Sequence, residues 1–137
     1  MDRRNFLILS GAAALVPGLA QAEISGLAYT PGLVADRLAK GETVFIDFYT
    51  DWCSTCRSQG RTIEALRKAT PAYDKHITFV KIDWDQFSGA AISKKYKIPR
   101  RSTLIMLKGD QELGRIVAGT RRDDIKALLD SGLPSNA

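Results

Sequence analysis

The segment Val44 to Tyr49 carries apolar residues at successive positions, so both of its faces are hydrophobic. A strand of this kind is typical of the centre of a sheet that helices cover on both sides. Asp47 is the single acid in this run, and we therefore expect it to be buried. Residues 57–69 follow without a proline and place Ile63 and Leu66 at helical spacing, which predicts a helix soon after the strand.

The rest of the chain alternates helical and strand patterns. In order, these are a helix over 30–41, a strand over 77–83, a helix over 88–96, a hairpin of strands over 103–107 and 112–117, and a last helix ending near 131. Thr30 and Thr120 are the expected N-caps, and residues 72–76 are expected to be a connection. This order predicts an α/β fold with a central mixed sheet flanked by helices on both faces.

Residues 1–22 have the pattern of an export signal peptide. Arg3 and Arg4 precede an apolar stretch over 6–16, Pro17 breaks it, and residues 20–22 form a small-x-small cleavage signal. The apolar stretch is shorter than the roughly 18–20 residues that a spanning helix needs. We therefore expect an exported, periplasmic protein in which residues 23–137 form one domain.

The leader also resembles a twin-arginine signal, whose pathway carries proteins that have already folded. The resemblance lies in the order Asp2-Arg3-Arg4-Asn5-Phe6-Leu7. Ile8 stands where that signal often has lysine, so the general secretory route stays open. Export of a leader fusion with Arg3 and Arg4 changed to lysine distinguishes the two routes.

Composition narrows the possible partners and cofactors. The formal net charge is +5, but most Lys and Arg residues are scattered among acids, so no nucleic-acid surface is expected. Cys53 and Cys56 are the only cysteines, and His76 is the only histidine, which leaves a zinc site short of ligands. Haem attachment would need histidine where Arg57 stands. The cysteine pair is then either a redox centre or a merely structural disulfide.

Cys53 stands at or just before the start of the helix predicted after the strand. The unpaired N–H groups and dipole of a helix N-terminus favour an anion, and thiols so placed titrate between about 3.5 and 7.5 rather than near 8.5. Cys53 is therefore the expected reactive thiol. Cys56 lies one turn further in and is expected to be less exposed.

The chain resembles the thioredoxin superfamily in Asp47, in the Trp52-Cys53-x-x-Cys56 core, in Lys81 of the next strand, and in the order of elements from 30 to 130. This resemblance implies a thioredoxin-like fold and a thiol-disulfide oxidoreductase without a cofactor. Cys53 would attack a substrate disulfide, and Cys56 would resolve the mixed disulfide. Asp47 would take the Cys56 proton, directly or through water, and Lys81 would tune Asp47.

One position departs from the family pattern. Members usually have a cis-proline before a threonine at the start of the strand that faces the cysteines, whereas here Ser102 precedes Thr103 and the nearest proline is Pro99. A non-proline cis bond costs about 2.5–4 kcal/mol, so we predict a trans bond between Arg101 and Ser102. Loss of the ring is expected to improve access to the sulfurs, to make adventitious metal binding easier, and to offer the Ser102 hydroxyl and N–H to a thiolate. The expected substrate-binding residues are Trp52, Arg101, Ser102 and Thr103.

The direction of electron flow is less constrained. Ser54-Thr55 matches neither the Gly-Pro pair of reducing thioredoxins nor the Pro-His pair of strong oxidants. A buried acid that helps to deprotonate the resolving cysteine favours reduction of protein disulfides, which requires a membrane-bound electron donor. A monomer is expected. A disulfide oxidase or isomerase, a carrier of copper or another soft metal on Cys53 and Cys56, and a redox-silent interaction module remain alternatives.

Overall fold

The computed structural model describes residues 26–137, so the expected leader over 1–22 lies outside the described residues. The elements, in chain order, are β1 (Leu27–Ala28), α2 (Leu33–Ala39), β2 (Thr43–Tyr49), α3 (Ser54–Ala69), α4 (Ala72–His76), β3 (Ile77–Asp83), α5 (Trp84–Phe87), α6 (Ala91–Lys95), β4 (Thr103–Lys108), β5 (Gln111–Val117) and α7 (Arg122–Asp130). No helix within residues 26–137 is long and apolar enough to cross a membrane.

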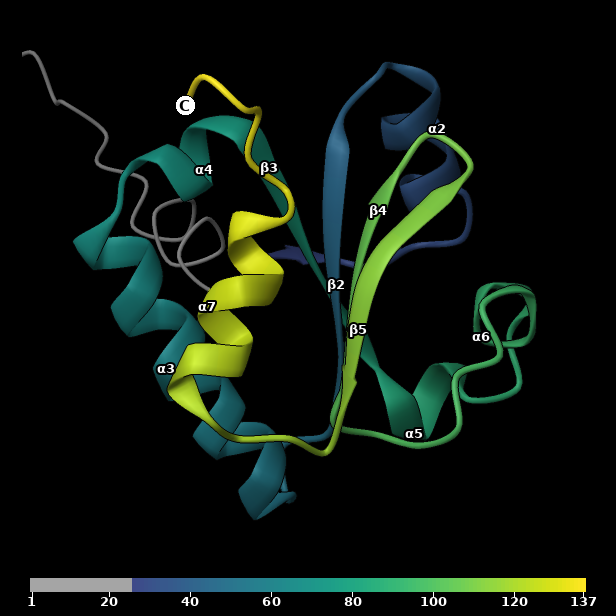
Figure 1. Cartoon of the computed structure of the whole chain (residues 1–137). Helices are drawn as coiled ribbons and strands as arrows, with labels where there is room; N and C mark the ends of the chain where they lie inside the picture. The colour runs from purple at the N-terminus through teal and green to yellow at the C-terminus, as the bar shows by residue number, and fades with distance from the viewer. Residues whose placement is uncertain (1–25) are drawn as a thin grey trace, which may run out of the picture.

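The strands form one mixed sheet in the order β1-β3-β2-β4-β5 (Figure 1). β1 and β2 both pair with β3 in parallel, while β4 is antiparallel to β2 and to β5. The segment with two apolar faces is thus the central strand, as its pattern predicts. The central mixed sheet expected from the sequence is confirmed.

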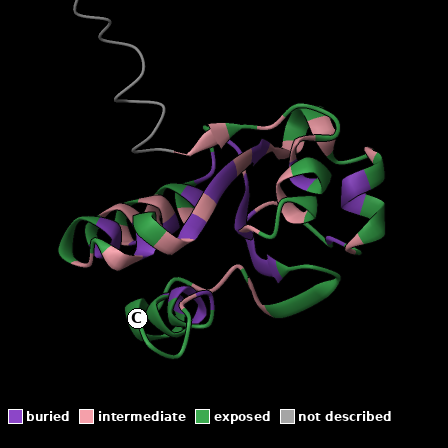
Figure 2. Cartoon of the chain, turned by 90° about the horizontal axis from the view of Figure 1, so that it is seen from above, coloured by how far each residue is buried: buried purple, intermediate pink, exposed green. Residues whose placement is uncertain are grey.

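Helices cover both faces of the sheet, with α3, α4 and α7 on one side and α2, α5 and α6 on the other (Figure 1). Phe45 of β2 packs with Ile63 and Leu66 of α3 in one core cluster. Ile46 and Phe48 point the opposite way and pack with Val34 of α2 in a second cluster. Figure 2 shows the buried residues concentrated along the strands, with exposed residues on the outer sides of the helices.

Several local expectations are wrong. Gly32, in a left-handed conformation with φ 92°, takes the N-cap position of α2, while Thr30 contributes only its carbonyl, which accepts from the Leu33 N–H at 3.0 Å. Arg121, rather than Thr120, takes the N-cap position of α7. Both threonines therefore stand outside the cap position that would let their side chains reach the first-turn N–H groups.

The connection expected over 72–76 is a short helix, α4, because the Tyr73 side chain is buried in the core beneath it. The helix expected over 88–96 is found as the shorter α6, and an additional short helix that was not expected, α5, precedes it. Asp83 starts α5 by accepting a hydrogen bond from the Asp85 N–H at 3.0 Å. α6 begins only after the turn at Gly89.

Candidate active site

The central strand β2 delivers both cysteines to the start of α3. Cys53 occupies the N-cap position, and its sulfur accepts a hydrogen bond from the Cys56 N–H at 3.3 Å. Its carbonyl accepts from the Arg57 N–H at 3.0 Å, which begins the helical ladder. The placement expected from the sequence, with the first cysteine immediately before a helix, is confirmed.

Both sulfurs are covered to a similar degree. Cys53 is 5% exposed and Cys56 is 4% exposed, so the expected difference between them is small. The hydroxyl of Ser102 lies against both, with Oγ at 3.3 Å from Cys53 Sγ and 3.0 Å from Cys56 Sγ. The serine in the proline slot therefore lies directly against the sulfurs, and easier access to them than with proline stays a prediction.

The pKa values of the two thiols shift in opposite directions. Burial raises the pKa of Cys53, but hydrogen bonds from Ser102, from the thiol and N–H of Cys56, and from Arg101 outweigh it and lower that pKa to about 6. Burial and the neighbouring Cys53 thiolate raise the pKa of Cys56, although Ser102 partly offsets this. Cys53 is accordingly the thiolate near neutral pH, and Cys56 holds its proton.

Ser102 holds an unusual backbone conformation immediately before β4. Its preceding peptide bond is trans, as predicted, and its φ of 65° lies in the left-handed region that most residues avoid. The Ser102 N–H donates to the Phe48 carbonyl at 2.7 Å, and its own carbonyl accepts from the Ala118 N–H at 2.9 Å. The expectation that this N–H serves a thiolate is wrong, since it joins the loop to the end of β2 instead.

Gln59 is a part of the site that the sequence does not reveal. It is buried on α3, one turn after Cys56, and its Nε2 donates to the carbonyls of Ser102 at 3.1 Å and Gly119 at 2.9 Å. These two bonds tie the helix to the loops before β4 and before α7. The only signal for it in the sequence is its spacing of three residues from Cys56, which places both on one helix face.

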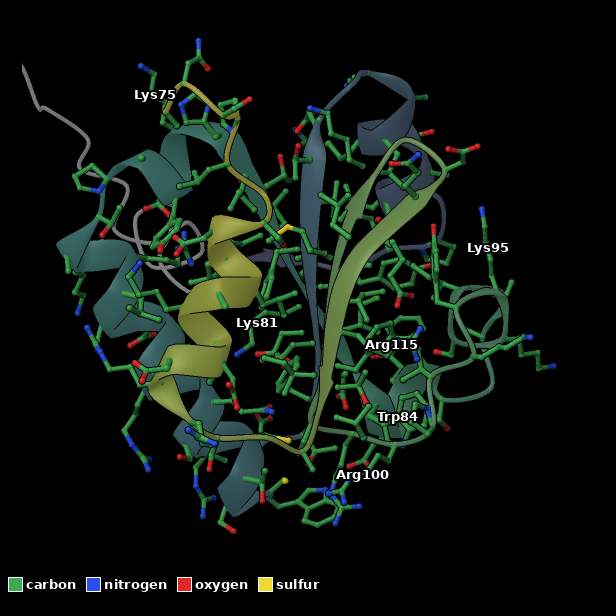
Figure 3. The ribbon with its side chains drawn as sticks, in the orientation of Figure 1. Lys75, Lys81, Trp84, Lys95, Arg100 and Arg115 are labelled. Carbon is green, nitrogen blue, oxygen red and sulfur yellow. The ribbon has the colours of Figure 1, made fainter. Side chains whose placement is uncertain are left out.

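Asp47 and Lys81 stand opposite each other on the neighbouring strands β2 and β3. Burial raises the pKa of Asp47 to about 7, Lys81 lowers it in part, and the Cys53 charge raises it further. Lys81 Nζ lies 4.1 Å from the centroid of the Tyr49 ring. Figure 3 shows Lys81 on the side of the sheet that α3 and α7 cover. The burial of Asp47 and the placement of Lys81 beside it are confirmed.

A polar cavity of about 310 Å³ reaches from the surface to this buried acid and to Cys56. Asp47 Oδ1 and Thr50 Oγ1 belong to residues that line it, and both atoms are buried without a hydrogen-bond partner among residues 26–137. Gly60 of α3 also lines the cavity. Cavities with unpaired polar atoms are the kind that hold ordered water, so this cavity is suited to water between the acid and solvent.

The rim beside the sulfurs is built around Trp52, which is 57% exposed. Its Nε1 donates to Asp85 Oδ2 at 2.7 Å, and the Arg101 guanidinium carbon lies 4.2 Å from its ring centroid. Because both contacts fix the indole, its exposed area forms a preordered apolar platform next to Cys53.

The other residues expected to contact a substrate differ in their availability. The Arg101 carbonyl accepts from Arg100 Nε at 2.9 Å, and the Arg100 side chain extends at the exposed edge of the site (Figure 3). Thr103 is fully buried, with its hydroxyl donating to the Arg100 carbonyl at 2.7 Å. Thr103 also pairs with Phe48 of β2 and with Val117 of β5, so the expectation that it contacts a substrate is wrong for this conformation.

Few side chains near the cysteines could bind a metal ion. No cluster of three or more His, Cys, Asp or Glu side chains suited to a metal ion occurs in the part of the chain that the structure describes. The donor set at the cysteines is therefore two sulfurs with the Ser102 hydroxyl beside them.

The central strand presents two cysteines at the start of a helix. One thiol is acidified, and a buried acid lies behind the other. These features define the class of thioredoxin-like dithiol proteins. The family model described as Thioredoxin matches residues 33–131. The chain belongs to the thioredoxin family, and it is a thiol-disulfide oxidoreductase.

Individual relatives agree with this assignment. The thioredoxin of Chlamydia trachomatis serovar D is 33% identical over 95 residues, covering 69% of this chain and 86% of the relative. An H-type thioredoxin of Fagopyrum esculentum is 34% identical over 85 residues, covering 62% and 67%. The crystal structure of Trxlp from Edwardsiella tarda EIB202 superposes with a TM-score of 0.63 at 28% identity, covering 78% of this chain and 97% of that one.

Proposed function

We propose that this protein reduces disulfide bonds of protein substrates in the periplasm. The observation that carries the reducing direction is Asp47, a buried carboxyl whose pKa of about 7 lets it accept a proton at neutral pH. It lines the same cavity as Cys56, the thiol that must lose a proton before it can attack. A base that accelerates this step speeds substrate reduction, whereas an oxidant gains less from it.

The reaction begins with the Cys53 thiolate, which attacks one sulfur of the substrate disulfide and displaces the other as a thiolate. Cys56 then gives its proton to Asp47, directly or through the water that the cavity admits, and attacks Cys53 Sγ. The two displaced thiolates take up protons, one returned by Asp47 and one from solvent, so the substrate leaves as a dithiol, and Cys53 and Cys56 remain as a disulfide. Lys81 tunes the step, because its charge keeps the pKa of Asp47 from rising further.

Substrate docking uses the rim beside the sulfurs. The Trp52 platform covers an apolar segment next to the scissile disulfide, and the Arg101 carbonyl pairs with the substrate chain. Pairing with the Arg101 carbonyl requires the Arg100 side chain to release it. The protein acts as a monomer in this proposal.

Location and electron supply complete the proposal. Residues 1–22 carry the export signal described above, with twin-arginine-like features in Arg3 and Arg4. In an oxidising compartment, a reductant must be returned to its dithiol form by a donor that draws electrons from the cytoplasm. A membrane-bound donor fits this requirement. A leader fusion whose export survives replacement of both arginines by lysine would exclude the twin-arginine route.

The test is the midpoint potential of the Cys53–Cys56 couple against glutathione, combined with a turbidity assay of insulin reduction. We expect a value near the roughly −270 mV of reducing thioredoxins, and a value near the −120 mV of a strong oxidase would overturn the direction. Cys56→Ser is expected to accumulate a mixed disulfide with the substrate, and Cys53→Ser is expected to form none. The opposite pattern would exchange the roles of the two cysteines.

A further inference from the structure

We propose that the Ser102 hydroxyl is a catalytic group that serves both sulfurs in turn, donating first to the Cys53 thiolate and then to the Cys56 thiolate. The inference rests on the proposed dithiol reaction and adds a third residue to its chemistry. It is carried by position, because Ser102 Oγ lies within hydrogen-bond distance of both sulfurs, at 3.3 and 3.0 Å.

The order of donation follows from the chemistry of a hydroxyl. Serine has one O–H and can donate to only one sulfur at a time, although its oxygen can accept from the other. In the resting dithiol, Cys53 is the thiolate and Cys56 holds its proton. The stable arrangement therefore has Ser102 donating to Cys53 and accepting from the Cys56 thiol.

After the first step, Cys56 rather than Cys53 is the sulfur that needs a hydrogen-bond donor. Once Cys53 is bonded to the substrate sulfur it carries no charge and is a weak acceptor, so the hydroxyl is free to rotate toward Cys56. Cys56 then loses its proton to the Asp47 carboxylate, and Ser102 donates to the new thiolate as it attacks Cys53 Sγ. The substrate sulfur departs with the electron pair of its broken bond, and Ser102 keeps its own proton throughout.

Burial strengthens the effect of this donor. Cys56 is 4% exposed, so a thiolate formed there depends on the donors beside it, which are the Ser102 hydroxyl and the Thr50 N–H. Ser102 is itself fully buried, which removes competing water from its hydroxyl. A hydrogen bond to a charged group under these conditions is worth about tenfold to a hundredfold in an equilibrium or a rate.

The backbone holds the hydroxyl in place. The Ser102 N–H is bound to the Phe48 carbonyl, and its carbonyl is bound by Gln59 and by the Ala118 N–H. Both backbone polar groups of the residue are thus engaged with other segments. Oγ stays between the two sulfurs, and rotation of the O–H about the Cβ–Oγ bond redirects the proton from one to the other. Gln59 is in this account a positioning residue for the hydroxyl.

The experiment compares Ser102→Ala with Ser93→Ala. Ser93 is a buried serine of α6 whose hydroxyl donates to the Phe87 carbonyl at 2.7 Å, so its replacement controls for the loss of one buried hydroxyl away from the sulfurs. Two quantities are measured. The first is the pH profile of Cys53 alkylation and thiolate absorbance, and the second is the rate at which a preformed mixed disulfide on Cys53 is resolved.

Ser102→Ala is expected to shift the Cys53 profile to higher pH and to slow resolution by about tenfold or more, with both quantities unchanged in Ser93→Ala. A shifted profile with unchanged resolution would overturn the second donation, and unchanged values for both would overturn the inference entirely. If the alanine variant does not fold, Ser102→Gly removes the same hydroxyl and suits the φ of 65°. A wild-type protein that reduces no disulfide refutes the proposed function itself, which separates the two failures.

Discussion

Replacing Asp47 by asparagine should remove a pH-dependent loss of stability that the buried acid imposes on the fold. The pKa of this carboxyl rises from 3.8 in the unfolded chain to about 7 in the folded protein. At 1.36 kcal/mol for each pH unit, this difference corresponds to about 4 kcal/mol. Between these two values the folded state holds a proton that the unfolded state has released.

Because the folded state holds this extra proton, raising the pH destabilises the folded state. Stability from this group is fully present below about pH 4 and is lost as the pH rises toward 7, after which the loss is constant. The asparagine variant cannot ionise, so its unfolding free energy should not fall over this range. At pH 8 it should exceed the wild type by about 1–3 kcal/mol, because an unpaired buried amide still costs part of the gain.

Urea unfolding of the oxidised protein, followed by tryptophan fluorescence from pH 4.5 to 8.5, measures this directly. In the disulfide form neither cysteine titrates, which leaves Asp47 as the buried group of interest. The Cys53 charge, the smallest of the three causes that shift the pKa of Asp47, is then absent, so the total loss in the wild type should lie below about 4 kcal/mol. Asp123→Asn removes an exposed acid from the first turn of α7 and should keep the wild-type slope. A wild-type stability that is flat over this range, or a slope that survives in Asp47→Asn, would refute the reasoning.

Three further predictions concern the backbone around the site. Ser102→Pro should destabilise the fold by about 3 kcal/mol or more, measured in a thermal melt, because proline cannot adopt a φ of 65° and has no N–H to donate to the Phe48 carbonyl. A wild-type melting temperature would contradict this. Gly60→Ala should raise the unfolding free energy by about 0.5–1 kcal/mol, since nothing lies within 4 Å of the added Cβ and alanine is the better helix former. An unchanged or lower unfolding free energy would show that the methyl group strains the helix. Gln59→Leu should lower stability by about 1–3 kcal/mol, as the carbonyls of Ser102 and Gly119 each lose a donor, and it should raise the pH at which Cys53 is alkylated.

The sequence predicts those parts of the molecule that a local pattern encodes. β2 has two apolar faces, so its central place and the burial of Asp47 follow from hydrophobicity alone. The position of Cys53 before α3 follows from the strand-to-helix transition at that point.

What the sequence does not predict depends on contacts between distant segments. Threonine is a residue type that often caps helices, but the left-handed turn at Gly32 moves the start of α2 beyond the reach of the Thr30 side chain. Gln59 is polar and unremarkable in its helix, and its burial depends on two carbonyls 43 and 60 residues away. The covering of the sulfurs by Ser102 likewise depends on a residue 49 positions from Cys53, whose conformation the neighbouring loop imposes.

The bonds from Gln59 to Ser102 and Gly119 also bear on when the chemistry appears during folding. They join α3 to the loop before β4 and the loop before α7, so they form only after the hairpin of β4 and β5 has docked on β2. Contacts of such long sequence separation are slow to form, because closing the intervening chain costs entropy. Until then, Cys53 lacks the hydrogen bond from Ser102, and only groups of its own helix, such as the Cys56 N–H, lower its pKa. The full acidity of Cys53 is thus a property of the completed fold.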